Sequence, residues 1–427
     1  YVKDPQIGRH KWVCSFDLNS LYPHLIMQYN ISPETLLGMH TRGGMVEALL
    51  NQEIDTDFLR EKNVTMTPNG SLYSRKAQGF LPALMEKMYT DRVKYKKMMI
   101  EEQKKGKSAD PNKLAQYHNM QINLKIALNS AYGALGNQWF RFYDVRNAEA
   151  VSVAGQLSIR WAERAVNEYL NKVLETDGRD YVIASDTDSL YVTLDSLVQK
   201  VGLEDKDKTI KFMDSVCDGK IQDVIDKCYS ELAEYVNAFQ QKMVMKREEP
   251  KLKIMGIEAV KSSTPEHCRN ALKKAFKIVV NGTEDEVIDF IENFKSEFKK
   301  LEPEEVSFPR SVKGLAKYKD PVYRKSTPLH VKGSLIYNMM LDKNKLTKKY
   351  PRIQEGEKIK YTYLMEPNPS GDSAIAMLST LPKEFNLDKY IDYDRQFEKS
   401  FLDPMKGILE TIGWDYERKS TIMDFFS

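Results

Sequence analysis

The residues with the clearest chemical potential are Asp186 and Asp188, in the stretch VIASDTDSLYVTL at 182–194. They interrupt a β-branched, apolar run of the kind that forms paired, buried strands. Two carboxylates at the turn of a hairpin repel each other, and burying either one unpaired costs several kcal/mol. A divalent cation would remove that cost, whereas an exposed Asp-rich turn is the simpler alternative. An EF-hand is excluded because the loop lacks a third ligand, a central Gly and a closing Glu.

A second aspartate, Asp17, ends another apolar strand, KWVCSFDL at 11–18, directly before a sharp turn. If the two strands lie side by side, Asp17 and Asp188 share one pair of cations. Carboxylates that hold two Mg²⁺ ions are the apparatus of in-line nucleotidyl transfer. Mg²⁺ suits this role because it binds few carboxylates and keeps positions for substrate phosphates.

Positive charge comes from two further segments. Lys125, Asn129 and Tyr132 are spaced i, i+4 and i+7, so they share one face of a helix. Arg92 and Lys96 are spaced i, i+4 on the preceding helical segment. Each charge alone is typical of an ordinary helix surface, but together they predict a clamp for a triphosphate.

The elements that must position these residues follow from periodicity and turn signals. Helices at 81–106 and 113–133, joined by the short connection KSADPN, predict a projecting helical hairpin. The other expected elements are a helix at 147–172, strands near 180–194, helix at 213–244, helices at 266–301, and a basic, irregular, partly stranded segment at 305–365.

The charge is distributed unevenly along the 427 residues, although the net charge is only +3. Residues 310–361 hold fourteen basic and four acidic side chains, interleaved with tyrosines. Such a block is typical of a polyanion-binding surface, with a solvated face as the alternative.

Cysteine usage and hydropathy limit the compartment. The four cysteines are widely separated and form no CxxC pair, which favours reduced thiols and argues against structural zinc. The sequence has no signal peptide and no apolar run of about 18 residues, the length of a membrane span. We therefore expect a cytoplasmic protein with no membrane segment.

Three ordered motifs resemble those of family B DNA polymerases: DLNSLYP (17–23), KIALNSAYG (125–133) and DTDS (186–189). The wider segments NSAYGALGNQWFRFYDVRNA and PKLKIMGIEAVKSSTP are similar to the replicative polymerases of T-even-type phages. This resemblance implies an α+β, right-hand fold with an antiparallel-sheet palm, helical-hairpin fingers and a mostly helical thumb. The implied divisions are palm at 1–78 and 138–256, fingers at 79–137, and thumb at 257–427.

The resemblance also implies roles for single residues. Asp17 and Asp188 would be the catalytic carboxylates that hold two Mg²⁺, for which Mn²⁺ is a substitute, with the Leu18 carbonyl as a further ligand and Asp186 in support. The residues implied to bind the incoming dNTP are Ser20, Leu21, Tyr22, Arg92, Lys96, Lys125 and Asn129. Those implied to contact the base pair or the DNA are Tyr132, Gly133, Lys317, His330 and Lys332.

The flat ring of Tyr22 under the deoxyribose would leave no room for a 2′-hydroxyl and so exclude ribonucleotides. The partners implied are primer–template DNA, dNTPs, and a sliding clamp that would take up the tail residues Ile422, Met423, Phe425 and Phe426. Such an enzyme, if encoded by a phage, would act in the host cytoplasm.

The sequence departs from the family pattern in several places. Asp17 is too near the N-terminus for a preceding exonuclease domain, so we expect a fragment or a separate exonuclease chain. A Lys-Lys-Arg-Tyr stretch that normally contacts the primer strand is missing from 242–256. His24 occupies the position of a small residue after LYP, and Glu248 corresponds loosely to an acidic residue near the metals.

The sequence therefore predicts template-directed DNA synthesis. Two alternatives remain open: a DNA-binding scaffold that has lost activity, and a reverse transcriptase or RNA polymerase. The latter usually carry two adjacent aspartates, and Tyr22 argues against ribonucleotide entry.

Overall fold

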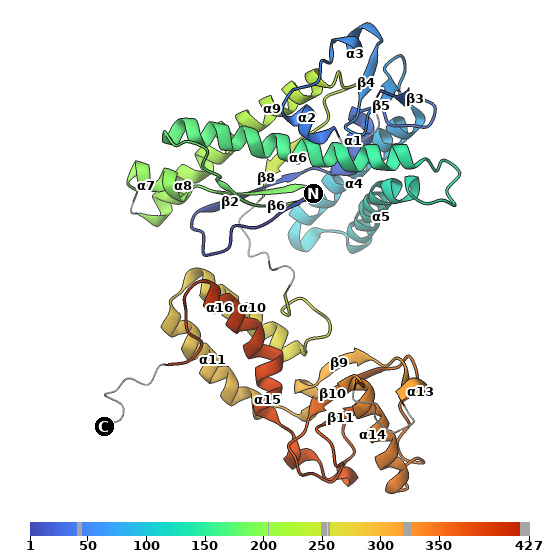
Figure 1. Cartoon of the computed structure of the whole chain (residues 1–427), viewed down its shortest axis with the longest axis vertical. Helices are drawn as coiled ribbons and strands as arrows, with labels where there is room; N and C mark the ends of the chain where they lie inside the picture. The colour runs from blue at the N-terminus through green and yellow to red at the C-terminus, as the bar shows by residue number, and fades with distance from the viewer. Residues whose placement is uncertain (41–44, 204, 249–253, 255–256, 319–325, 419–427) are drawn as a thin grey trace. The chain divides into compact units, whose positions relative to one another are not determined.

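A computed structural model describes residues 1–40, 45–203, 205–248, 254, 257–318 and 326–418. The chain divides into two compact units, residues 1–6 with 10–250 and residues 7–9 with 251–427 (Figure 1). Both are mixed helix and sheet, and every strand pairing described is antiparallel. The expected α+β class is therefore confirmed.

A five-stranded sheet forms the centre of the first unit, in the order β1-β6-β7-β2-β8. Its strands are β1 (Val2–Lys3), β2 (Val13–Leu18), β6 (Val182–Asp186), β7 (Ser189–Thr193) and β8 (Met245–Arg247). Along β2, Cys14, Phe16 and Leu18 are buried while Ser15 and Asp17 are only half-buried. Because side chains alternate between the faces of a strand, the sheet has one core face and one more open face.

Three helices build the core beneath this sheet: α1 (Leu21–Gln28), α6 (Val145–Leu174) and α9 (Gln222–Tyr235). Figure 1 shows α6 running along this unit, where it contacts β6 and β7. The α6 helix begins where the Asp144 side chain accepts the Arg146 amide, and it ends at Glu175, whose φ is +58°. It buries a stripe at helical spacing: Ala150, Val151, Ala154, Leu157, Trp161, Val166 and Leu170.

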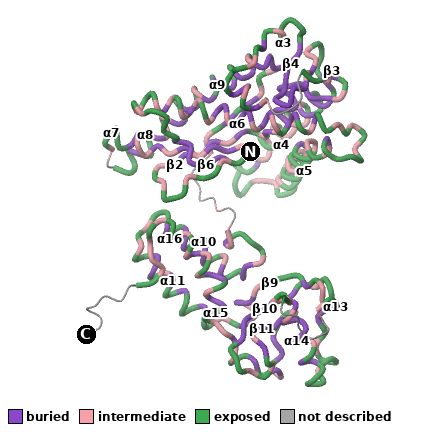
Figure 2. Tube along the Cα trace, in the orientation of Figure 1, coloured by how far each residue is buried: buried purple, intermediate pink, exposed green. Residues whose placement is uncertain are grey.

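The helical hairpin is confirmed as α4 (Phe80–Lys104) and α5 (Pro111–Leu135), which pack against each other. Asp110 caps α5 by accepting the amides of Asn112 and Lys113, and Pro111 takes the first helical position, where a missing N–H costs nothing. Only Leu128 and Leu135 are buried on α5, and Figure 2 shows most of this helix exposed.

The remaining elements of the first unit surround this frame. A small sheet has the order β3-β5-β4. Its strands are β3 (Leu36–Met39), β4 (Val64–Met66) and β5 (Ser71–Ser74). The other elements are α2 (Val46–Leu50), α3 (Asp57–Glu61), η1 (Gly106–Ser108), α7 (Asp195–Val201), α8 (Lys206–Ser215) and the π-helix η2 (Val216–Ile221).

The second unit has two cores. One is an aromatic cluster that includes Phe294, Phe298, Phe397 and Phe401. It is enclosed by helices α10 (Glu266–Asn281), α11 (Glu284–Phe298), α12 (Pro303–Val306), α15 (Tyr393–Phe397), η5 (Glu398–Leu402) and α16 (Asp403–Thr411).

The other core lies under the sheet β11-β10-β9, formed by β9 (Phe308–Ser311), β10 (Lys358–Tyr363) and β11 (Ala374–Met377). Helix α14 (Leu329–Lys343) packs on it, and the short elements nearby are α13 (Leu315–Tyr318), η3 (Lys383–Phe385) and η4 (Asp388–Tyr390). Gly333 permits this packing because a Cβ there would lie 2.9 Å from the backbone of β11.

Two sequence predictions need correction here. The segment 305–365 is not merely irregular and stranded, because α14 forms fifteen residues of it. The helix expected at 213–244 ends at Tyr235 instead. Two residues later, Asn237 has a φ of +48°, and its side-chain amide donates to the backbone carbonyls of Leu59 and Val64. These bonds tie the chain just after α9 to the segment 59–64, so the helix does not continue.

Among the residues that the structure describes, no helix is long and apolar enough to cross a membrane.

The turn between β6 and β7 contains a backbone outlier. The Asp188 amide donates to the Asp186 carbonyl at 2.6 Å across Thr187, whose φ is +54°. A β-branched residue rarely adopts this region, since Cβ crowds the backbone. The Thr187 amide donates in turn to the Tyr1 carbonyl, and Val2 pairs with Asp186, so β1 holds the turn from outside.

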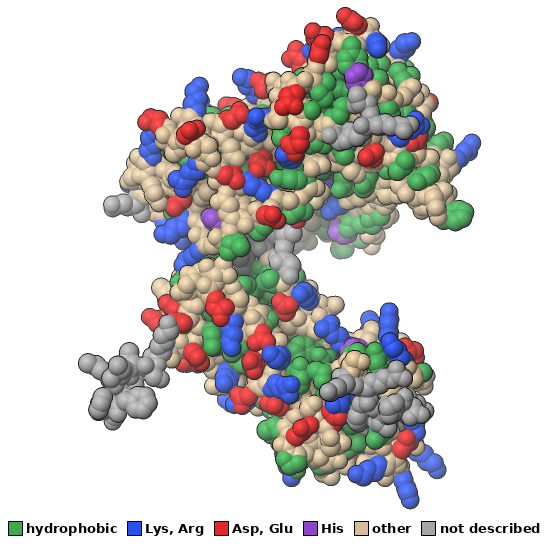
Figure 3. Space-filling model, in the orientation of Figure 1, with side chains coloured by type: hydrophobic (Ala, Val, Ile, Leu, Met, Phe, Trp, Pro, Cys, Tyr) green, Lys and Arg blue, Asp and Glu red, His purple; other side chains and the backbone are tan. Residues whose placement is uncertain are grey.

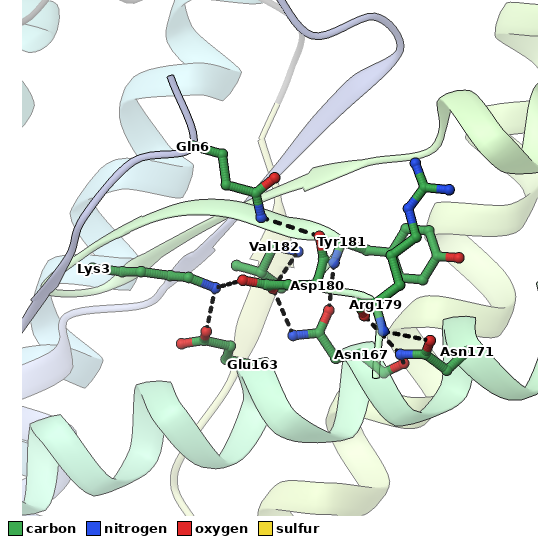
Figure 4. A network of polar contacts seen from close by, with 9 residues as sticks. All are labelled: Lys3, Gln6, Glu163, Asn167, Asn171, Arg179, Asp180, Tyr181 and Val182. Atoms are coloured by element: carbon green, nitrogen blue, oxygen red, sulfur yellow. Dashed lines mark hydrogen bonds and ion pairs between the residues drawn. The ribbon is translucent and has the colours of Figure 1, made fainter. Parts of the chain in front are cut away.

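A polar network anchors β1 to the rest of the unit (Figure 4). Lys3 Nζ lies 2.5 Å from both Glu163 of α6 and Asp180, the residue that leads into β6. Asn167 Nδ2 donates to Asp180 at 2.9 Å. Burial alone would lower the pKa of Lys3, but the bonds to Asp180 and Glu163 outweigh it and raise the pKa. The cation therefore stays charged between two carboxylates.

We predict that Thr187→Gly leaves the free energy of unfolding unchanged or raises it by up to about 1 kcal/mol, since glycine relieves the left-handed backbone at some cost in entropy. Thr193→Gly is the matched control, because Thr193 lies in regular β7 and also donates a side-chain bond, to the Lys11 carbonyl. That change should destabilise the protein in chemical denaturation. Equal losses from both variants would contradict the turn conformation.

We predict that Lys3→Met lowers the free energy of unfolding by about 1–2 kcal/mol, between the values for exposed and buried pairs, because two carboxylates lose their shared cation. Lys172→Met, at an exposed position of α6, is the control and should change stability by less than about 0.5 kcal/mol. Equal midpoints for the two variants in thermal unfolding would show that the network contributes nothing.

Candidate active site

The two aspartates predicted to act together are brought together by the pairing of β2 with β7. Asp17 lies opposite Ser189 in the antiparallel register. The Ser189 hydroxyl donates to Asp17 Oδ2 at 2.8 Å, and the Leu18 amide donates to the Asp188 carbonyl at 2.8 Å. Asp17 and Asp188, far apart in the sequence, thus sit at neighbouring positions of one strand pair.

Glu248 lies on the same face of the sheet as Asp17. Its amide donates to the Ser15 carbonyl at 2.9 Å, and its carboxylate accepts from the Ser15 hydroxyl at 3.3 Å. Ser15 and Asp17 are two residues apart on β2, so their side chains point the same way. The open face of the sheet therefore carries the acidic side chains of Asp17 and Glu248 along β2.

Asp186 occupies a different position, at the end of β6. It pairs with Ser189 across the hairpin and with Val2 of β1, and its carboxylate accepts from the Thr187 hydroxyl at 3.1 Å. These contacts place it at the base of the turn that carries Asp188.

The donor set at this edge fits a hard divalent cation in chemistry. Two carboxylates and the backbone carbonyl of Leu18 offer oxygen ligands, and such a set leaves positions for water and phosphate oxygens. Within the described ranges, no three or more His, Cys, Asp or Glu side chains are grouped so as to hold a metal by themselves.

Directly after Asp17 the chain turns sharply into α1. Ser20, at the N-cap, has φ +47° and ψ +56°, a left-handed conformation that is uncommon for serine. Its hydroxyl accepts from the Arg92 guanidinium of α4 at 3.0 Å. Leu21 is buried and would be contacted by any Cβ added at Gly155 of α6. Strained backbone therefore flanks both aspartates, at Ser20 and at Thr187.

An aromatic stack joins α1 to the helical hairpin. The rings of Tyr22 and Tyr132 are 4.5 Å apart at an interplanar angle of 21°, and the Tyr132 hydroxyl lies 2.6 Å from the Ser152 hydroxyl of α6. The pKa of Tyr22 is raised chiefly by burial, and to a smaller extent by Tyr132 and by the negative charge of Asp188. The Tyr22 ring therefore lies within the electrostatic reach of the carboxylate.

The other predicted nucleotide-binding residues lie farther out on the hairpin. Lys96 is about one turn beyond Arg92 on α4, and its side chain is exposed. On α5, Lys125 and Asn129 precede Tyr132 and are exposed too. Gly133 faces open space, since a Cβ added there would meet nothing within 4 Å.

The predicted DNA contacts of the second unit have mixed environments. Lys317 is exposed on α13, whereas Lys332 lies 2.6 Å from Asp372, a nearly buried carboxylate. The His330 ring centroid is 6.2 Å from that of Tyr361. The pKa of His330 is lowered chiefly by burial, and further by the positive charge of Arg310.

The basic block 310–361 is partly neutralised by ion pairs, such as Lys349 with Glu384 and Arg352 with Asp342. Figure 3 shows acidic and basic side chains mixed over this unit on the face drawn. The predicted clamp-binding residues of the tail, Ile422, Met423, Phe425 and Phe426, lie outside the described residues.

Sequence reasoning missed two supporting hydroxyls. Ser189 was part of the DTDS motif, and its place directly opposite Asp17 would have suggested the contact once the strands were paired. Ser152 carried no local signal, because its partner Tyr132 is on another helix.

Comparisons with known proteins agree with these features. A family model described as DNA polymerase family B matches residues 1–410. The DNA-directed DNA polymerases of Enterobacteria phage T4 and Escherichia phage RB69 are 31% and 32% identical to the chain, over 99% and 100% of its length and 56% of theirs. A DNA polymerase of Pyrococcus glycovorans is 26% identical over 97% of the chain and 47% of that protein.

The chain thus spans about half the length of these relatives. The match to the family model takes in both aspartate segments, the helical hairpin and most of the second unit. On this evidence the chain belongs to DNA polymerase family B.

Proposed function

We propose that this chain carries out template-directed DNA synthesis, adding dNTPs to a primer 3′-hydroxyl. The observation that carries the proposal is the pairing of β2 with β7, which sets Asp17 beside Asp188, with Arg92 held over the following turn. Carboxylates next to a cationic helical hairpin are what nucleotidyl transfer needs.

Asp17, Asp188 and the Leu18 carbonyl would hold two Mg²⁺ ions, with Mn²⁺ as a substitute. When bound, such a pair of cations lowers the pKa of the attacking hydroxyl and neutralises charge on the pyrophosphate leaving group. Asp186 would support the turn that presents Asp188, consistent with its position at the base of the hairpin.

The hairpin would bind the nucleotide. Arg92, Lys96 and Lys125 would hold the triphosphate, with Ser20 and Leu21 lining the site. Asn129, Tyr132 and Gly133 would lie against the new base pair, and the open space at Gly133 leaves room for it. Lys317, His330 and Lys332 would contact duplex phosphates, which carry no sequence information and suit an enzyme that must copy any template.

The corresponding subdivision is palm at 1–78 and 138–256, fingers at 79–137 and thumb at 257–427. The packed pair α4 and α5 supports the fingers assignment, and the division of the chain into compact units near residue 250 supports a separate thumb.

Two other functions remain as alternatives. A DNA-binding scaffold would not need carboxylates in register or Arg92 fixed beside them. The second alternative is a reverse transcriptase or RNA polymerase, and the ring of Tyr22, stacked on Tyr132, argues against ribonucleotide entry.

Asp17→Ala and Asp188→Ala should each reduce primer extension with Mg²⁺ by at least about 10³-fold, since either change removes half of the carboxylate pair. Asp207→Ala, an exposed carboxylate on α8, is the control and should retain activity. Single-turnover assays with primer–template DNA and dNTPs measure this. No extension by wild type or by either variant would favour the scaffold, and extension by all three at one rate would contradict the catalytic role of the two aspartates.

Tyr22→Ala should raise the use of ribonucleotides relative to dNTPs by about 10-fold or more, because the ring that blocks the 2′-hydroxyl is removed. A tenfold change corresponds to relief of a steric clash of about 1.4 kcal/mol. Tyr22→Phe keeps the ring and should keep the selectivity. The ratio of kcat/KM for dNTP and NTP incorporation is the measurement. An unchanged ratio in Tyr22→Ala would place the sugar discrimination elsewhere.

We further propose that the tail binds a sliding clamp, because Ile422, Met423, Phe425 and Phe426 form an apolar end suited to a pocket on a partner. Removing residues 420–427 should spare distributive synthesis and shorten products made with the clamp. Clamp-dependent products of full length would contradict this role.

A further inference from the structure

Buried His24 on α1 is not used by the proposed reaction. His24 is only 6% exposed. It lies one turn after Ser20, on the helix that carries Tyr22. A buried imidazole that close to the nucleotide-binding residues calls for a physical explanation.

His24 binds the Ser20 carbonyl through two atoms. Its backbone amide donates at 3.2 Å, and its Nδ1 lies 3.0 Å from the same oxygen. A carbonyl oxygen only accepts, so Nδ1 carries the proton. These two bonds hold Ser20 in its left-handed conformation, for which the residue has no side-chain capping bond of its own.

The ring of His24 also packs on α4. It meets Tyr89 edge-on, with centroids 4.5 Å apart and an interplanar angle of 84°. Tyr89 is three residues before Arg92, so the two side chains share one face of α4. The contacts form a closed circuit, from His24 to the Ser20 carbonyl, from the Ser20 hydroxyl to Arg92, and from Tyr89 back to His24.

Charge in this circuit is arranged around a neutral imidazole. Burial lowers the pKa of His24; the bond to the Ser20 carbonyl opposes this, and the neighbouring cations Lys242 and Arg92 lower it further. Lys242 is itself paired with Glu86 of α4 at 2.7 Å. A protonated ring would face two cations, whereas the neutral ring donates one bond and packs on Tyr89.

We propose that His24 is a positioning residue that fixes the Arg92 guanidinium for the incoming triphosphate, by holding the Ser20 turn and the Tyr89 face of α4 together. This rests on the proposed function, because Arg92 matters for catalysis only if the site binds a nucleotide. Arg92 Nε is buried and donates to no described atom, so no bond from that nitrogen fixes the guanidinium.

The test is a set of variants assayed by steady-state primer extension. His24→Leu removes the donor and should raise KM for dNTP about 3- to 10-fold, with kcat and the affinity for primer–template DNA changed less than about 2-fold. His24→Asn places an amide N–H near the position of Nδ1 and should recover most of the loss. His118→Leu, an exposed histidine on α5, is the control and should match wild type.

A double-mutant cycle separates positioning from general loss of structure. In an Arg92→Ala background, His24→Leu should change KM less than about 2-fold, because the residue that it positions is gone. Full additivity of the two changes would overturn the proposal, and so would an unchanged KM in His24→Leu.

If wild type does not extend a primer, the proposed function fails, and a second measurement then decides the role of His24. Binding of a fluorescent dNTP analogue to the chain with Mg²⁺ should weaken in His24→Leu and recover in His24→Asn. Equal affinities in wild type and His24→Leu would overturn the inference.

Discussion

The register of β2 against β7 is the constraint on which the candidate active site depends. With Asp17 opposite Ser189, the apolar residues Cys14, Phe16 and Leu18 face the core. A slip of one residue would turn Asp17 into the core and expose its apolar neighbours. The hydrophobic core thus selects the same register that sets Asp17 beside Asp188. Because β8 pairs with the other edge of β2, the register is fixed from both sides.

The proposed nucleotide site is built outward from this strand pair by packing. Only two residues separate the end of β2 from the start of α1, so the register of the sheet also sets Ser20 and Tyr22. From there, Arg92 reaches the turn from α4, and Tyr132 stacks on Tyr22 from α5. Each helix of the hairpin therefore has its own contact with α1. A movement of the hairpin would therefore alter both contacts at once.

Local patterns in the sequence predicted what local physics determines. The apolar runs ending at Asp17 and Asp186 indicated strands, and 3.6-residue periodicity indicated α4, α5 and α6. The meeting of Asp17 with Asp188 was predicted because both lie where a strand ends. Features that depend on distant partners were not predictable. The pairing of Val2 with Asp186, the stacking of Tyr22 on Tyr132 and the neutralisation of Lys332 by Asp372 join segments with no shared signal. The early end of α9 also depends on distant partners, because the Asn237 side chain just after it donates to the carbonyls of Leu59 and Val64.

The most direct test is to locate the cations themselves. Crystals of the chain with primer–template DNA, a dNTP and Mn²⁺ would give anomalous scattering at each bound ion. Two peaks about 3.5–4 Å apart are expected, each within about 2.0–2.6 Å of a carboxylate oxygen of Asp17 or Asp188. Peaks held by other residues, or none near either aspartate in a crystal that contains the dNTP, would contradict a shared catalytic metal site.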